Sequence, residues 1–391
     1  MARSILVRAA HAANLTLLLG SLWVGGCASV PSLPPDFPHK DPGAREHAES
    51  LRESVQAIAG GWGNFSRRSA ALERIEAFGL EEATTTEWID WFSFQTNVLI
   101  EIKGTSPKPR IVYLVAHYDK ADVNPFKLAS ILVNGLIDEL VGWTFLSEGA
   151  IDNASGVAVV LELAKALKES PSGTTYRILL VGAEESGLRG SRAHVAGIPD
   201  DIWDQVRLAV NFDCVGVDLG PNAVVTSESN SVESNFWASK VEETAERLKM
   251  PLWVGPFRRD SDSDHEPFAA TSFGRDLLRG LKFSFPSPFA LLPQRSWFTE
   301  SRRVPTILFS TQSFVDLGQG TDLLWGLLCL PLMRIHGPRD SAARIDPQRL
   351  YEVFRIAFEA LKEFDALWED GTGDGPSRGW PFSTRRRDTP F

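Results

Sequence analysis

The sequence predicts an α/β fold: a three-layer sandwich in which helices flank a central, mostly parallel mixed β-sheet. Short continuous apolar runs, typical of strands buried on both faces, alternate with longer segments whose apolar residues recur at helical spacing. This alternation is the pattern of α/β domains. The chain has 391 residues, 43% of them hydrophobic, which is enough apolar material for one large core. No internal repeat is visible, so we expect a single domain at 45–369.

The expected elements follow one another in chain order. Runs that we expect to be strands are 97–102, 110–116, 177–181, 208–212 and 305–310. The first two flank a turn that contains Gly104 and Pro107, as in a hairpin. Segments with helical periodicity are 45–59, 157–168 and 233–248. A last helix begins at Asp346-Pro347, because Asp is a favoured N-cap and Pro suits the first helical position.

The first 26 residues are typical of an export signal. Arg3 and Arg8 form a short basic region, and 15–24 is an apolar run too short to span a bilayer as a stable helix. The following Val24-Gly25-Gly26-Cys27 resembles the lipobox of bacterial lipoproteins. The resemblance implies cleavage before Cys27, acylation of that residue and, because Ala28 is not Asp, sorting to the outer membrane, facing the periplasm. An ordinary secretory signal cut nearby is the alternative.

Four further segments are expected to lie outside the regular elements. The Pro-rich residues 27–44 suggest an extended tether between lipid and domain. The connections 120–148 and 271–304 are long, and loops of this length are either functional lids, disordered segments or additional packing. Residues 370–391 are rich in Gly, Pro and Arg and are expected to form a loose tail.

The net charge of −10 argues against nucleic acid as a partner. Besides Cys27, the chain contains Cys214 and Cys329. An exported protein could pair them, but a core of this size does not need one bridge, so we expect two buried free thiols.

Five short blocks carry side chains that can bind metal. They centre on His117, Asp152, the pair Glu184-Glu185, Asp213 and His336. Two His, two Asp and one Glu make a nitrogen and oxygen ligand set for two Zn²⁺ ions, and one carboxylate is left over as a base.

Three of these blocks directly follow an expected strand. His117 ends the run 110–116, Glu184 and Glu185 follow 177–181, and Asp213 closes 208–212. Open α/β sheets bind ligands at the carboxyl ends of their strands, so side chains distant in sequence can converge there.

The order of the blocks resembles the co-catalytic zinc aminopeptidases and carboxypeptidases of the M28 type, over about residues 45–368. The resemblance implies a fold of the zinc-peptidase type and peptide substrates. It also implies that His117 and Asp213 hold one zinc, that Glu185 and His336 hold the other, and that Asp152 bridges both. Glu184 would be the general base. The family usually has Thr where Gly337 stands, so His336 departs from its pattern.

Two carboxylates are expected to support this set. Asp119, two residues after His117, would belong to the catalytic machinery by accepting the second imidazole N–H. Asp340 would support the site around His336. His265, in Ser263-Asp264-His265-Glu266-Pro267-Phe268, lies in another block of the family that does not bind metal. The resemblance also predicts a cis peptide bond between Asp152 and Asn153.

The sequence therefore predicts a zinc-dependent exopeptidase, and an aminopeptidase in particular, attached to the membrane by lipid. Three alternatives stay open. A transferase like the glutaminyl cyclases shares the fold but uses one zinc, and intact His117 and Asp213 argue for two. A carboxypeptidase is the second alternative. The third is an inactive binding lipoprotein, which the presence of both Glu184 and Glu185 disfavours.

Overall fold

The computed structural model describes residues 29–35, 37, 43–89, 95–121, 147–226, 232–256, 263–269, 304–317, 335–337 and 339–370. Within them, eight strands form one mixed sheet in the order β1-β2-β4-β3-β5-β8-β6-β7. The strands are β1 Thr84–Trp88, β2 Thr96–Ile102, β3 Ile111–His117, β4 Thr175–Val181, β5 Val206–Phe212, β6 Asn222–Thr226, β7 Leu252–Pro256 and β8 Thr306–Thr311. The centre of the sheet, β4-β3-β5-β8, is parallel, whereas β1, β2 and the β8–β6 junction are antiparallel.

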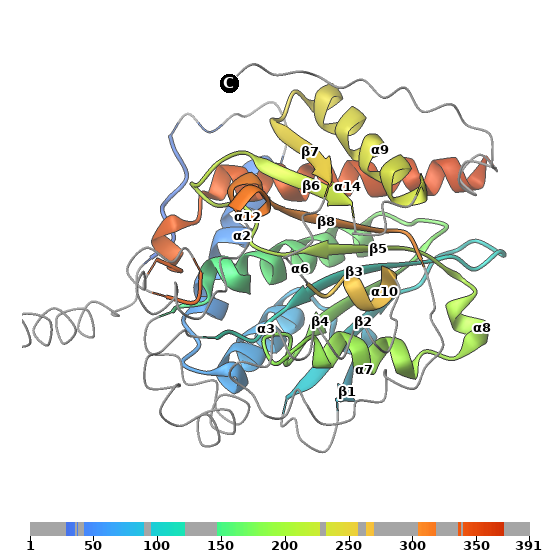
Figure 1. The fold of residues 1–391 in the computed structure, drawn as a ribbon, viewed down its shortest axis with the longest axis horizontal. Coiled ribbons are helices and arrows are strands. Elements are labelled where there is room, and N and C mark those ends of the chain that lie inside the picture. Colours follow the sequence, from blue (N-terminus) through green and yellow to red (C-terminus); the bar gives the residue numbers. More distant parts are fainter. Residues whose placement is uncertain are drawn as a thin grey trace, which may run out of the picture.

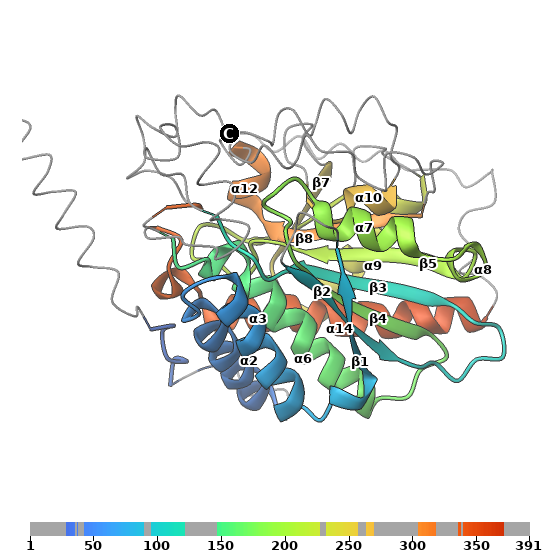
Figure 2. The same cartoon turned by 90° about the horizontal axis from the view of Figure 1, so that it is seen from below.

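Helices cover both faces of the sheet, so the predicted three-layer α/β sandwich is confirmed (Figures 1 and 2). One face carries α2 Ala44–Ala59, α3 Asn64–Ala77, α6 Ser155–Glu169, α9 Val232–Leu248 and α14 Pro347–Glu369. The other carries α7 Arg189–Gly197 and the short helix α10 Glu266–Ala269, with α8 Asp200–Trp203 at the rim and α12 Gln312–Leu317 after β8. The main core lies on the first face, and a smaller cluster around Tyr113 and Phe268 lies on the second.

The helices begin and pack as their sequences indicate. The Asp346 carboxylate accepts hydrogen bonds from the backbone N–H groups of Gln348 and Arg349, and Pro347 is the first residue of α14. The apolar stripe of α14 from Leu350 to Phe364 is buried. α6 is apolar on almost every side because it lies between the sheet and the pair α2 and α14.

The expectation that β2 and β3 form a hairpin is wrong. β4 lies between these strands, antiparallel to β2 and parallel to β3. The connection passes over the start of β4, where the N–H groups of Thr105 and Ser106 donate to the carbonyls of Ser172 and Gly173. A Cβ at Gly104 would lie 2.4 Å from the Gly173 carbonyl oxygen, so this close crossing requires glycine.

The described part of the N-terminal segment packs on the domain, although its Pro-rich composition predicted an extended tether. Val30, Leu33 and Phe37 are buried in the main core. The Val30 N–H donates to Gln56 Oε1 on α2 at 2.7 Å, and the Phe37 ring lies 5.6 Å from that of Tyr351 on α14. The Phe37 N–H donates to the Pro34 carbonyl at 3.1 Å, and burial of the three apolar side chains stabilises the docked segment.

Several expectations concern residues outside the described ranges. These are the signal and Cys27, Cys329, residues 371–391 and almost all of the two long connections, 120–148 and 271–304. Cys214 is a buried free thiol. No helix among the described residues combines the length and apolar composition needed to cross a bilayer.

Candidate metal centre

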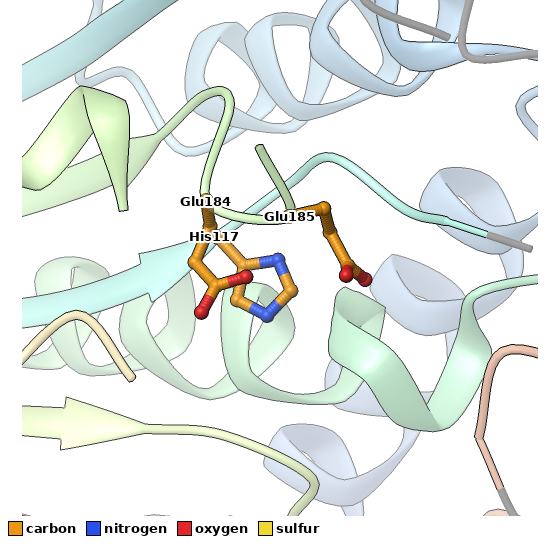
Figure 3. Close-up of side chains that lie close together, drawn as sticks. All are labelled: His117, Glu184 and Glu185. Atoms are coloured by element: carbon orange, nitrogen blue, oxygen red, sulfur yellow. The ribbon is translucent and has the colours of Figure 1, made fainter. Parts of the chain in front are cut away.

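The predicted metal-binding side chains converge at the carboxyl ends of β3, β4 and β5. His117 is the last residue of β3, Glu184 and Glu185 lie in the turn after β4, and Asp213 follows β5. Asp152 lies in the turn η2 (Ala150–Ala154) that leads into α6. Figure 3 shows the Glu184 carboxylate beside the imidazole of His117. The Glu185 carboxylate lies apart from the Glu184 carboxylate. Because parallel strands end at one edge, residues almost 100 positions apart share one site.

Asp152 is the centre of the cluster. Its Oδ1 lies 3.0 Å from His117 Nε2, and its Oδ2 lies 3.0 Å from His336 Nε2. Each oxygen therefore faces a different histidine. The peptide bond between Asp152 and Asn153 is cis, as predicted. The Asn153 side chain donates to the carbonyl of Phe212 and accepts from the N–H of Gly156, which ties this turn to the end of β5 and to α6.

Two potential metal sites share Asp152. The first consists of His117, Asp152 and Asp213, and the second of Asp152, Glu185 and His336. In each, one ligand atom per residue lies within 4.8 Å of the others. A third group, of His117, Glu184 and Glu185, overlaps both. Within the described part of the chain, His265 belongs to none of these groups; its Nε2 lies 3.5 Å from Glu266 Oε1.

The donor atoms fit cations. Asp213 Oδ1 and Glu185 Oε1 are buried and accept no hydrogen bond from the described residues, although a histidine nitrogen lies 3.6 Å and 3.1 Å away, respectively. Unpaired buried carboxylate oxygens are costly unless a cation compensates them. Imidazole and carboxylate donors in groups of three are the set that zinc uses in catalytic sites.

Asp119 supports the turn after β4 more directly than it supports His117. Its carboxylate oxygens accept hydrogen bonds from the backbone N–H groups of Glu184 and Glu185, both at 3.2 Å. His117 Nδ1 lies 3.2 Å from the Asp119 carbonyl oxygen and 3.5 Å from its Oδ1. The expected partner of the second imidazole N–H was the carboxylate, whereas the carbonyl is nearer. Asp119 thus fixes both neighbouring glutamates.

Asp340 holds the turn that presents Asp152. Its Oδ1 accepts the backbone N–H groups of Ile151 and Asp152 at 2.7 and 3.3 Å, and its Oδ2 accepts the Ser147 hydroxyl at 2.6 Å. Burial, followed by the charge of Asp152, raises the pKa of Asp340 to about 7. Asp340 therefore supports the site by holding the backbone at Ile151 and Asp152.

Two supporting residues were not predicted. Arg67 of α3 is fully buried, and its guanidinium donates to the carbonyls of Tyr118, Glu148 and Gly149. These carbonyls belong to the two loops that carry His117 and Asp152. Ser263 donates its hydroxyl to Asp213 Oδ2 at 2.7 Å. A single Arg in an amphipathic helix gives no sequence signal for such a contact. Ser263, in contrast, is the first residue of the Ser263-Asp264-His265 block, so the sequence could have indicated it.

Burial and mutual charge shift the pKa values of the cluster. Burial, reinforced by Asp264 and Glu185 and opposed by His117, raises the pKa of Glu184 well above the ordinary value of 4.5. Burial disfavours the charged form of His117, but the charge of Glu184 and the nearby aspartates outweigh this effect and raise the pKa of His117. Burial also opposes ionisation of Asp152, yet hydrogen bonds from His117 and His336 lower its pKa.

Parts of this chain are similar in sequence to known proteins. Residues 97–282 match the model of Peptidase family M28. Aminopeptidase YwaD of Bacillus subtilis is 29% identical over 163 residues, which is 41% of this chain and 30% of that protein. Leucine aminopeptidase 2 of Trichophyton equinum is 31% identical over 175 residues, 45% of this chain and 29% of that protein. The match thus spans less than a third of each curated relative.

A solved glutaminyl cyclase from an Acidobacteriales bacterium has the same fold, with a TM-score of 0.56 over 86% of this chain and 99% of that one, at 13% identity. The likeness concerns the fold alone. The family match, in contrast, covers every residue of the cluster except His336. Residues 97–282 of this chain therefore belong to peptidase family M28.

Proposed function

We propose that the chain is a zinc-dependent aminopeptidase with two metal ions per chain. The observation that carries the proposal is the position of Asp152, whose two carboxylate oxygens face His117 and His336 separately. His117 and Asp213 would complete one metal site, and Glu185 and His336 the other. Zinc bound in such a site polarises a carbonyl group and makes water more acidic.

Glu184 is the general base in this proposal. It adjoins the cluster without belonging to either of the two sites that share Asp152. Its carboxylate accepts the proton of the attacking water and then delivers it to the leaving amine of the cleaved bond. A raised pKa suits this role because the group must both accept and release a proton near neutral pH. The backbone hydrogen bonds from Glu184 and Glu185 to Asp119 keep the two carboxylates in separate positions.

Substrate assays of the purified mature protein test this activity. We expect release of the N-terminal residue from aminoacyl p-nitroanilides and short peptides, and no cleavage of the same peptides after N-acetylation. Release of the C-terminal residue from acetylated peptides would indicate a carboxypeptidase instead. Ring closure of N-terminal glutamine, without hydrolysis, would indicate a cyclase. Zinc-loaded protein with no activity on any of these would leave only the binding function.

We also propose that the protein is exported and attached through Cys27 to the bacterial outer membrane, facing the periplasm. The basic residues, the apolar run and the lipobox-like Val24-Gly25-Gly26-Cys27 support this. Cys27→Ser should move the protein from membrane to soluble fractions. Its turnover of a small aminoacyl substrate should stay nearly the same, because Cys27 has no role in the proposed chemistry. Unchanged membrane association would show that Cys27 is not the attachment point.

A further inference from the structure

Two aromatic side chains lie exposed at the beginning of α3. Trp62 is 64% exposed and Phe65 is 46% exposed, and they are three positions apart around the helix start. We call these two residues the aromatic patch. Most large apolar side chains among the described residues are buried, and only Trp88 and Val232 are as exposed as the patch. Neighbouring exposed aromatics are a common feature of surfaces that contact a partner or a membrane.

The aromatic patch lies at the same end of the domain as the metal centre. Asn64, between its two members, accepts the backbone N–H of Lys120 through its side chain. Arg67, one turn further, donates to the carbonyl of Gly149. Both contacts join the start of α3 to the loops that carry the metal-binding side chains. Val232 lies at the opposite end, since the nearby Ser234 hydroxyl accepts the N–H of Thr306 at the beginning of β8.

The N-terminal segment reaches the domain at this same end. Val30 is buried, and its N–H donates to Gln56 Oε1 in the last turn of α2. Trp62 follows Gln56 by six positions along the chain. Cys27 precedes Val30 by three positions, and an extended chain spans at most about 3.6 Å per residue. The α-carbon of Cys27 therefore lies within about 11 Å of that of Val30.

We propose that the aromatic patch enters the interfacial layer of the bilayer to which Cys27 is attached. The inference rests on the proposed lipid attachment and is independent of the peptidase chemistry. Because the docked segment leaves so short a free chain, the surface near Gln56 must stay close to the lipid headgroups. Tryptophan and phenylalanine are stabilised in that layer, where apolar surface leaves water. Attachment makes this contact intramolecular, so even a small patch is occupied.

The patch would fix how the domain sits on the membrane. A single flexible lipid attachment leaves the domain free to rotate, whereas two points of contact select one orientation. The selected orientation brings the end that carries the metal centre towards the bilayer, and turns the end that carries Val232 away from it. Position 65 and position 232 are equally exposed, at 46%, and so form a matched pair for a test.

The test uses the full-length mature lipoprotein in vesicles of phosphatidylethanolamine and phosphatidylglycerol. Phe65→Cys and, separately, Val232→Cys are labelled with an environment-sensitive fluorophore in a Cys329→Ser background, where Cys214 is buried. We expect lipids brominated on their acyl chains to quench the probe at position 65 and shift its emission to shorter wavelength. The probe at position 232 should show neither effect. Turnover of a small aminoacyl substrate checks that each labelled protein is folded.

Flotation of the same samples separates the possible failures. Protein that floats with the vesicles while position 65 behaves like position 232 overturns the aromatic patch proposal and leaves lipid attachment intact. Protein that does not float contradicts lipid attachment, and the patch proposal falls with it. Shielding of position 65 that rises with protein concentration in detergent, and not with vesicles, would assign the patch to a second copy of the chain and also overturn the proposal.

Discussion

At the scale of single residues, the adjacent Glu184 and Glu185 lie beside different histidines. Glu185 Oε1 is 3.1 Å from His336 Nε2, whereas Glu184 lies beside His117 (Figure 3). Glu184→Gln should therefore leave the zinc content unchanged and lower kcat by at least about 10²-fold, the usual scale of general-base catalysis. Glu185→Gln should instead lose metal. Metal analysis and steady-state kinetics on both variants distinguish the two roles. Full activity of Glu184→Gln on every substrate would exclude it as the base.

The two candidate histidines make a second comparison at this scale. His336 lies 3.0 Å from Asp152 Oδ2, whereas His265 is fully buried at the start of α10, outside the metal-binding groups of the described residues. His336→Ala should lose zinc and activity together. His265→Ala should keep its zinc, although it can lose stability because a buried side chain is removed. Zinc loss from His265→Ala and retention in His336→Ala would reverse the ligand assignment.

The sequence identified the clustered side chains but not all the groups that hold them. His117, Glu184, Glu185 and Asp213 could be located because each lies at or shortly after the end of a strand, and these strand ends meet at one edge. Arg67 could not be located in this way. Its contacts are with backbone carbonyls, which every residue has, so neither its partners nor their positions leave a mark in the sequence.

At the scale of elements, Arg67 joins α3 to the loops after β3 and before α6. Burial lowers the pKa of Arg67 to about 10, although the nearby carboxylates of Asp340 and Asp119 oppose this, so the side chain stays charged at neutral pH. Arg67→Met removes three hydrogen bonds from a charged, buried donor to carbonyl groups. The free energy of unfolding of the variant should fall by roughly 3 kcal/mol.

Arg74→Met is the matched control, since Arg74 is also on α3 but is partly exposed and bonds mainly to Ser50 and Ser54 of α2. Urea denaturation of the metal-free proteins should show a clearly smaller loss for the control. Zinc affinity should fall only in Arg67→Met. Equal losses of stability and unchanged zinc affinity would show that Arg67 has no particular link to the site.

Element order was the part of the fold that the sequence could not supply. The runs 97–102 and 110–116 were correctly expected to be strands, yet their pairing was wrong because β4 inserts between them. The order of the strands depends on long-range pairing, which the residues of a local turn do not indicate. The short strands β1, β6 and β7 were missed. β1 is half exposed and rich in Thr, so it lacks the apolar run used to recognise the others.

At the scale of the whole molecule, one sheet and one main core present all the metal-binding side chains at one edge. The three-layer architecture could be predicted because buried strands and amphipathic helices alternate along the chain. The docking of residues 29–35 and Phe37 could not, since a Pro-rich segment has no periodicity and its packing depends on three separate apolar side chains. This docking would place the proposed membrane attachment at Cys27 near the end of the domain that carries the site.

The ratio of zinc to protein in the active enzyme tests the central claim most directly. Because Asp152 is shared by both sites, mass spectrometric metal analysis should find two zinc ions per chain in the wild type and neither in Asp152→Asn. Asp213→Asn and Glu185→Gln should each lose the ion at their own site. Asp218→Asn, which changes an exposed aspartate paired with Arg344, should keep both ions. A fully active wild type with a single zinc ion, or Asp152→Asn with both ions bound, would contradict the bridged two-metal centre.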